Sequence, residues 1–233
     1  MPKIICENLT FSYKKGKSKI DVFKDFNGTF QSNKINVILG ESGCGKTTLL
    51  KCIAGLNDFK GNIYFDETLV NGLPVQERNI GYLSQNFAMY PHLTLFDSIA
   101  FPLKVSGASI NETRERVYEI AEQFDIADLL SRKPKQVSFG QLQRAALARA
   151  LIKNPSICLF DEPLSNLDET NKVNFRHYLK RVLNERITTV IYVTHNYEEV
   201  ETIADEVFIM EEGKIKEKLS KKIYKSCKRI IKR

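Results

Sequence analysis

The chain of 233 residues contains no tryptophan, three methionines and three histidines, and it has no long uncharged apolar run. Because a helix that spans a bilayer needs about 20 consecutive apolar residues, we expect no membrane span. The start Met1-Pro2-Lys3 lacks the apolar stretch of a secretory signal. We therefore expect the chain to stay in the cytoplasm.

Cysteine is sparse as well. The five cysteines show no spacing typical of metal ligands or of a disulfide framework, so we interpret them as reduced thiols. With 42% hydrophobic residues the chain can bury one large core without disulfides. The cysteines are Cys6, Cys44, Cys52, Cys158 and Cys227.

Negative charge is scarce near the C-terminus. The net charge is +7, and most of the excess lies between Lys214 and Arg233. Leu219, Ile223, Cys227 and Ile230 recur there at helical spacing among lysines, which predicts a basic amphipathic helix. Such a helix suits a membrane surface, nucleic acid, or an apolar stripe resting on the domain, and the sequence leaves these open.

A glycine-rich motif between residues 40 and 47 carries the first chemical signal. The residues match G-x-x-x-x-G-K-[ST], a loop whose backbone N–H groups wrap a polyphosphate while a lysine and a hydroxyl reach phosphate and magnesium. An apolar strand is predicted at 35–39 and a helix at 47–56, whose positive N-terminal end would face the phosphates. The motif consists of Gly40, Glu41, Ser42, Gly43, Cys44, Gly45, Lys46 and Thr47.

The rest of the chain alternates strands and helices. Short apolar runs at 157–160, 190–193 and 207–210 are typical of strands covered on both faces, which predicts a parallel sheet in an α/β fold. Residues 88–134 switch to helical spacing, with Ser109 and Glu112 placed as a capping box. We interpret this stretch as an inserted helical subdomain.

Two acidic residues follow the strand at 157–160. Asp161 would lie at the carboxyl end of a parallel strand, where open α/β sheets bind ligands, and would hold magnesium. Glu162 comes next and is placed to activate a water for attack on a γ-phosphate, so we predict that it is the general base.

Together these motifs resemble the nucleotide-binding subunits of ATP-binding cassette transporters over nearly the whole chain. In that family a glutamine loop, a signature, an aspartate loop and a switch histidine follow the phosphate loop. Gln85, the stretch 138–141, Asp168 and His195 match them in order, and Tyr13 resembles the aromatic on which adenine stacks.

The resemblance implies an ATPase with ATP and Mg²⁺ as its ligands. It implies a P-loop NTPase fold with a parallel RecA-like sheet, an N-terminal antiparallel β portion and an inserted helical subdomain. We expect a single domain with a catalytic core at 1–87 and 135–213, the insertion at 88–134 and a basic tail at 214–233. The implied catalytic residues are Lys46, Gln85, Glu162 and His195; the metal site is Thr47, Gln85 and Asp161; and nucleotide contacts come from Tyr13, the loop 40–47, Thr48, Ser138, Gly140, Gln141 and Asp168.

The signature departs from the family's usual Leu-Ser-Gly-Gly-Gln, because Phe139 replaces the first glycine. Ser138, Gly140 and Gln141 remain at the start of a predicted helix, whose N-terminus suits an anion. A phenylalanine supplies the same backbone N–H, provided that its side chain points away from the nucleotide and its φ is negative.

In this family the signature of one subunit closes on ATP held by another, so the resemblance implies a head-to-tail dimer. The segment 88–104 looks like that of sugar and polyamine importers, where it receives a helix of the membrane-spanning permease. The same apolar residues could instead form the subdomain's own core. Sugar-importer subunits usually continue into a regulatory domain, whereas this sequence ends soon after Lys214, so small-solute import is the safer prediction.

The expected partners are permease subunits, a second cassette and a solute-binding protein, at the cytoplasmic side of the cell membrane. Two alternatives stay open. One is the ATPase of an exporter or a lipoprotein-release machine, which the catalytic motifs do not distinguish. The other is a soluble cassette protein acting on nucleic acid or ribosomes, suggested by the basic tail, although such proteins generally carry two cassettes; we expect no nucleic-acid partner.

Overall fold

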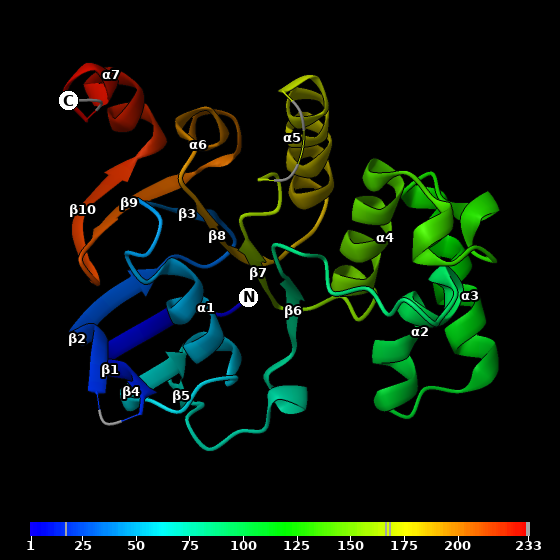
Figure 1. The fold of residues 1–233 in the computed structure, drawn as a ribbon, viewed down its shortest axis with the longest axis horizontal. Helices are drawn as coiled ribbons and strands as arrows, with labels where there is room; N and C mark the ends of the chain where they lie inside the picture. The colour runs from blue at the N-terminus through cyan, green and yellow to red at the C-terminus, as the bar shows by residue number, and fades with distance from the viewer. Residues whose placement is uncertain (17, 166, 168, 232–233) are drawn as a thin grey trace.

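The computed structural model describes residues 1–16, 18–165, 167 and 169–231, and it contains two β-sheets and a layer of helices (Figure 1). The larger sheet has six strands in the order β10-β9-β3-β8-β7-β6. All neighbours run parallel except β10, which is antiparallel to β9. Its strands are β3 (Ile35–Leu39), β6 (Ile80–Leu83), β7 (Ile157–Asp161), β8 (Thr189–Thr194), β9 (Glu206–Glu211) and β10 (Lys214–Ser220).

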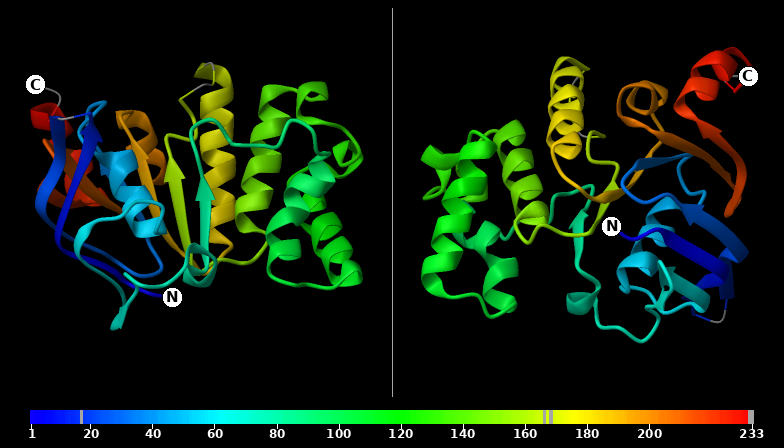
Figure 2. Two further views of the ribbon diagram at one scale, coloured as in Figure 1. Left: turned by 60° about the horizontal axis from the view of Figure 1, so that its bottom comes forward. Right: turned by 180° about the vertical axis from the view of Figure 1, so that it is seen from behind.

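Both faces of this sheet are covered, as the continuous apolar strands predict. Ile38 of β3 packs with α1 (Lys46–Ala54) and with the N-terminal strands, whereas its neighbour Val37 packs on the opposite side. That opposite side carries α5 (Glu169–Asn184) and α6 (Tyr197–Ile203), which Figure 2 shows from two directions. The predicted parallel sheet is confirmed.

The smaller sheet is antiparallel, with the order β2-β1-β4-β5. It confirms the N-terminal antiparallel portion of the predicted fold. Its strands are β1 (Ile4–Lys15), β2 (Ser18–Phe30), β4 (Lys60–Phe65) and β5 (Thr68–Leu69), and the short 3₁₀ helix η1 (Val75–Arg78) leads from it to β6. Helix α1 lies between the two sheets, and Gly55 in the left-handed conformation ends it at Ala54, before the predicted end at residue 56.

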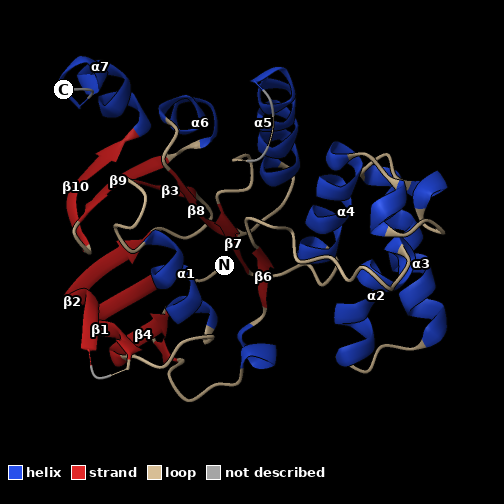
Figure 3. Ribbon diagram, viewed as in Figure 1, coloured by secondary structure: helices blue, strands red, loops and turns tan. Residues whose placement is uncertain are grey.

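Helices follow β6, as predicted from residue 88 onward (Figure 3). The Ser109 hydroxyl accepts the backbone N–H of Glu112, so the predicted N-cap is present. Helix α4 packs on α2 and α3 and also contacts β6, so it joins the helical layer to the larger sheet. Its elements are α2 (Leu95–Val105), α3 (Ile110–Gln123), η2 (Ala127–Leu129), η3 (Pro134–Gln136) and α4 (Phe139–Leu151).

The prediction of a helix through the basic tail from Lys214 is wrong for its first seven residues. Lys214–Ser220 forms β10, because a turn at Gly213 lets this segment pair back along β9. The helix α7 (Lys221–Ile231) starts after it and packs on β9 and β10. Leu219 therefore belongs to a strand, and the side chain that α7 buries completely is Tyr224, while Ile223 is half exposed. The side chains of Cys227 and Ile230 lie outside the description.

Among the described residues, no helix is both long and apolar enough to cross a bilayer.

Candidate active site

The glycine-rich loop connects the end of β3 to the start of α1. Gly43 and Gly45 have φ of +86° and +108°, a region that disfavours side chains. A β-carbon at Gly43 would meet nothing within 4 Å, so the loop has open space on that side. The N-cap of α1 is Gly45, no side chain caps the helix, and its first turn has no acidic residue. The free N–H groups of this first turn are therefore available to an anion.

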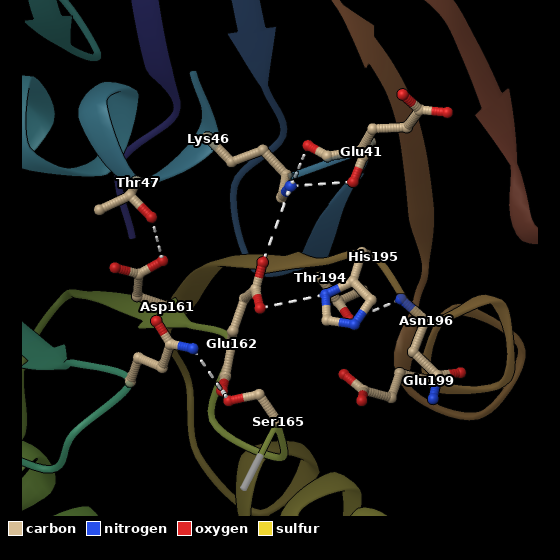
Figure 4. A network of polar contacts seen from close by, with 12 residues as sticks. Glu41, Lys46, Thr47, Asp161, Glu162, Ser165, Thr194, His195, Asn196 and Glu199 are labelled. Carbon is tan, nitrogen blue, oxygen red and sulfur yellow. Dashed lines mark hydrogen bonds and ion pairs between the residues drawn. The ribbon is translucent and has the colours of Figure 1, made fainter. Parts of the chain in front are cut away.

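Lys46 folds back over the mouth of this loop. Its Nζ donates to the carbonyl oxygens of Gly40 and Glu41, both at 2.8 Å, and lies 3.7 Å from a carboxylate oxygen of Glu162 (Figure 4). The side chain is 4% exposed. A buried ammonium held by carbonyl oxygens can exchange these acceptors for phosphate oxygens without losing hydrogen bonds.

Thr47 and Asp161 meet across the gap between α1 and β7. The Thr47 hydroxyl donates to Asp161 Oδ1 at 2.7 Å, and the hydroxyl of Tyr82 donates to Asp161 Oδ2 at 3.3 Å. Burial raises the pKa of Asp161 above its ordinary value, and these two hydrogen bonds oppose that effect. Burial and the charge of Asp161 also raise the pKa of Tyr82, so its hydroxyl keeps its proton and acts as donor.

Glu162 occupies the position directly beyond β7. Its backbone has φ of +45°, which is uncommon for a residue other than glycine and marks a local cost of about 1–3 kcal/mol. Its backbone N–H donates to the carbonyl of Val193, and its carboxylate lies between Lys46 and His195. The strained turn aims the carboxylate at the space in front of the loop (Figure 4).

His195 follows β8 and faces Glu162. Its Nδ1 lies 3.0 Å from Glu162 Oε2. Beneath it, the buried Glu199 accepts the hydroxyl of Tyr192 at 2.7 Å, and burial raises the pKa of Glu199 above its ordinary value. Glu162, His195 and Glu199 line one small cavity of about 30 Å³.

Gln85 lies two residues beyond β6, next to the turn after β7. Its side-chain amide donates to the hydroxyl of Ser165 at 3.4 Å, and the same hydroxyl donates to the carbonyl of Glu162 at 2.9 Å. The glutamine is thus joined through one serine to the turn that carries Glu162. Asp168, predicted to contact nucleotide, lies outside the described residues.

Tyr13 of β1 lies at the edge of the same region. Its ring is 44% exposed, and its hydroxyl is 3.2 Å from the hydroxyl of Thr48 on α1. The ring of Phe11 packs edge-on against it at a centroid distance of 4.8 Å. Tyr13 is therefore held beside the phosphate loop with a ring face open to solvent.

The signature residues lie apart from this cluster, at the start of α4 in the helical layer. Ser138 and Gln141 form a reciprocal capping box: the Gln141 N–H donates to Ser138 Oγ at 3.3 Å, and the Ser138 N–H donates to Gln141 Oε1 at 2.9 Å. Together with Gly140 they line a separate cavity of about 300 Å³ beside α5. No hydrogen bond that the structure describes joins them to the phosphate loop of the same chain.

Phe139 meets the backbone condition that the sequence set for it, and the orientation of its side chain away from bound nucleotide stays a prediction. Its φ is negative, and its ring packs against that of Phe87 at a centroid distance of 5.2 Å. Phe87 and Ala88 both have positive φ, and Arg149 of α4 donates to each of their carbonyl oxygens at 2.7 Å. The segment after Gln85 is thus tied to the helix that begins with the signature.

The residues present fit ATP and Mg²⁺. The open loop and the uncapped start of α1 suit phosphates, and Mg²⁺ needs only one or two protein oxygens because phosphates and waters complete its shell. Thr47 and Asp161 supply such oxygens side by side. No group of three or more acidic, histidine or cysteine side chains that could hold a metal occurs in the described parts of the chain, and Mg²⁺ bound to phosphates does not require one.

Sequence reasoning missed four residues of this region. Tyr82, Ser165 and Glu199 contact predicted site residues or their immediate support, and Arg149 holds the segment after Gln85. Tyr82 and Ser165 carried a signal, because they lie in the stretches that match the glutamine loop and the aspartate loop of the family. The roles of the predicted site residues stay predictions.

A family model and several known proteins match this chain in sequence. The family model described as ABC transporter matches residues 23–165. The chain is 42% identical over 212 residues to the uncharacterized ABC transporter ATP-binding protein YurJ of Bacillus subtilis, covering 90% of this chain and 58% of that protein. It is 39% identical over 216 residues to the maltose/maltodextrin import ATP-binding protein MalK of Escherichia coli, covering 92% and 57%. The chain thus spans little more than half the length of these relatives.

Solved structures agree. A dimeric post-hydrolysis state of the ATP-binding cassette MJ0796 bound to ADP and Pi superposes with a TM-score of 0.83 and 30% sequence identity. The match covers 93% of this chain and 98% of that one.

Proposed function

This chain belongs to the ABC transporter family, and from that premise we propose that it hydrolyses ATP to drive import of a small solute through separate permease subunits. The proposal rests on one observation above all. Lys46, Thr47, Asp161, Glu162 and His195 converge at one edge of the parallel sheet, whereas the signature faces a different space. One copy therefore holds half of each of two ATP sites.

A second copy would complete the site. In a head-to-tail dimer, Ser138, Gly140 and Gln141 of one chain would close on nucleotide held by the loop of the other. The solved relative that is dimeric and bound to ADP and Pi supports this arrangement. The capping box occupies the N–H groups of Ser138 and Gln141, so the N–H groups of Phe139 and Gly140 would be the ones offered to an anion at the start of this helix.

The chemistry follows from the contacts around Glu162. The water oxygen bonds to the γ-phosphorus as the bond to the bridging oxygen of ADP breaks, and Glu162 accepts the water's proton. Lys46 exchanges the carbonyls of Gly40 and Glu41 for phosphate oxygens and neutralises their charge. His195 fixes Glu162 through Nδ1 and presents its other edge to the departing phosphate. Thr47, Asp161 and Gln85 would hold Mg²⁺, which would supply further charge neutralisation when bound, and Tyr13 would stack on the adenine.

The permease would dock beside α2. Leu95, Ile99 and Leu103 of this helix are buried in the core, so part of the alternative core interpretation holds. Phe101 and Val105 remain 41% and 58% exposed. This exposed pair follows the segment after Gln85 that Arg149 ties to α4, so motion at Gln85 would reach it. The relatives named as maltose importers support import, and we place the chain at the cytoplasmic side of the membrane with a solute-binding protein in the same system.

The test compares Phe101→Arg with Ile110→Arg, a matched change at an 87% exposed residue at the start of α3. Each variant is co-expressed with candidate permease subunits and assayed for ATP hydrolysis in detergent and for transport in proteoliposomes. We expect Phe101→Arg to keep hydrolysis and lose co-purification and transport, while Ile110→Arg keeps all three. Normal transport by Phe101→Arg would refute the docking surface, and absence of ATP hydrolysis in the wild type would refute the proposed activity.

A further inference from the structure

Tyr82 lies on β6, the edge strand next to β7. It is in register with Leu159 of β7, so its side chain leaves the sheet on the same face as Leu159. Asp161 is two residues further along β7 and therefore projects from that face as well. Helix α1 packs over this face, which brings Thr47 to Asp161 from the other side.

Each oxygen of the Asp161 carboxylate accepts a hydrogen bond from a different hydroxyl group. Thr47 donates to Oδ1 at 2.7 Å, and Tyr82 donates to Oδ2 at 3.3 Å. Asp161 is 5% exposed, so water has little access to either oxygen. Without Tyr82, Oδ2 would lose this donor in a nearly buried setting, and the carboxylate could turn about its last side-chain bond to find another.

The ring of Tyr82 packs at the edge of the apolar cluster beneath α1. A phenylalanine would fill that space equally well, because the two side chains differ only by the hydroxyl. Packing therefore accounts for the ring and leaves the hydroxyl unexplained. Among the described residues the hydroxyl donates to Oδ2 of Asp161, the carboxylate oxygen that does not accept from Thr47.

We propose that Tyr82 is a positioning residue for the metal aspartate: by holding Oδ2 it keeps Oδ1 turned toward Thr47 and the bound Mg²⁺. The inference rests on the proposed magnesium site. Donors that fix a metal-binding carboxylate from behind typically contribute about 10–100-fold in metal affinity. The hydroxyl of Tyr82 donates to Asp161, so we expect its effect on nucleotide binding to pass through the metal.

The experiment measures binding of a fluorescent, non-hydrolysable ATP analogue in EDTA and in excess Mg²⁺. The dissociation constant in EDTA divided by that in Mg²⁺ gives the coupling between metal and nucleotide. For Tyr82→Phe we expect the ratio to fall about 10-fold while the affinity in EDTA stays at the wild-type value. Tyr118→Phe is the matched control, because Tyr118 lies exposed on α3, and it should leave both constants unchanged.

The variant Asp161→Asn distinguishes a failure of the positioning role of Tyr82 from a failure of the proposed metal site. If Asp161→Asn loses the effect of Mg²⁺ while Tyr82→Phe keeps the wild-type ratio, the positioning role is wrong and the metal site stands. If Asp161→Asn keeps the wild-type ratio, the proposed metal site fails and the inference fails with it. An equal loss of affinity in EDTA and in Mg²⁺ for Tyr82→Phe would indicate general damage to the loop and would also overturn the proposal.

Discussion

Replacing Arg149 by methionine should release the segment that follows Gln85. Arg149 donates to the carbonyl oxygens of Phe87 and Ala88 at 2.7 Å each, and its guanidinium lies 5.8 Å from the centre of the Tyr90 ring. Burial lowers the pKa of Arg149 from its ordinary value, but a guanidinium stays charged in proteins. Methionine keeps most of the apolar stem and removes both hydrogen bonds.

The size of the effect follows from these contacts. A hydrogen bond from a charged donor contributes about 1.5–3 kcal/mol, and water replaces part of this at the exposed carbonyl of Ala88. We therefore expect a net loss of about 2 kcal/mol. The positive φ of Phe87 and Ala88 costs about 1–2 kcal/mol at each residue, so without the clamp the segment gains by relaxing.

Two assays report the loss. For a domain of this size about 2 kcal/mol corresponds to a fall in Tm of about 4–8 °C. Amides at 85–90 should exchange hydrogen about 30-fold faster, since every 1.4 kcal/mol changes an opening equilibrium about tenfold. Arg114→Met on the exposed face of α3 is the control and should change neither quantity. An unchanged Tm together with unchanged exchange at 85–90 in Arg149→Met would refute the clamp.

Two further predictions concern the loop and the signature. Phe139→Gly should leave ATP hydrolysis unchanged or higher, because the ring packs on Phe87 and not on the capping box. Its Tm should fall by a few degrees, because glycine costs about 0.5–1 kcal/mol in a helix. A clear loss of activity in both Phe139→Gly and Phe139→Ala would assign the ring a role of its own. Burial raises the pKa of Cys44 above its ordinary value of 9.0, so a maleimide should react with it slowly at neutral pH and faster as the pH rises. The modified protein should no longer bind nucleotide, and Cys44→Ser should resist the reagent. Normal nucleotide affinity after modification of Cys44 would contradict this prediction.

The parallel sheet and the phosphate loop could be predicted because their signals are local. Continuous apolar runs such as 157–160 admit few alternatives, and glycine is required where Gly43 and Gly45 take positive φ. The order of the later motifs was readable through the family resemblance. These signals placed Thr47, Asp161, Glu162 and His195 at one edge of the sheet, where the structure has them.

Contacts between distant segments could not be read in the same way. The pairing of Lys214–Ser220 with β9 depends on the turn at Gly213, and helical spacing of Leu219 with Ile223 concealed it. Arg149 donates to the carbonyl oxygens of Ala88 and Phe87, which precede it by 61 and 62 positions in the chain. No local sequence pattern predicts such a contact. The packing of α4 on α2 and α3 likewise joins segments distant in the chain, and the predicted domain boundaries stay a prediction.

The central claim is that two copies of this chain share ATP sites in which Glu162 is the general base. Glu162→Gln keeps the size of the side chain and removes the proton acceptor beside His195. In one measurement, size-exclusion chromatography with Mg-ATP followed by nucleotide analysis of the peaks, the variant should elute as a dimer that retains ATP. We expect its kcat to be about 10²–10⁴-fold below wild type. A monomer in ATP, or a dimer that hydrolyses ATP at the wild-type rate, would contradict the account.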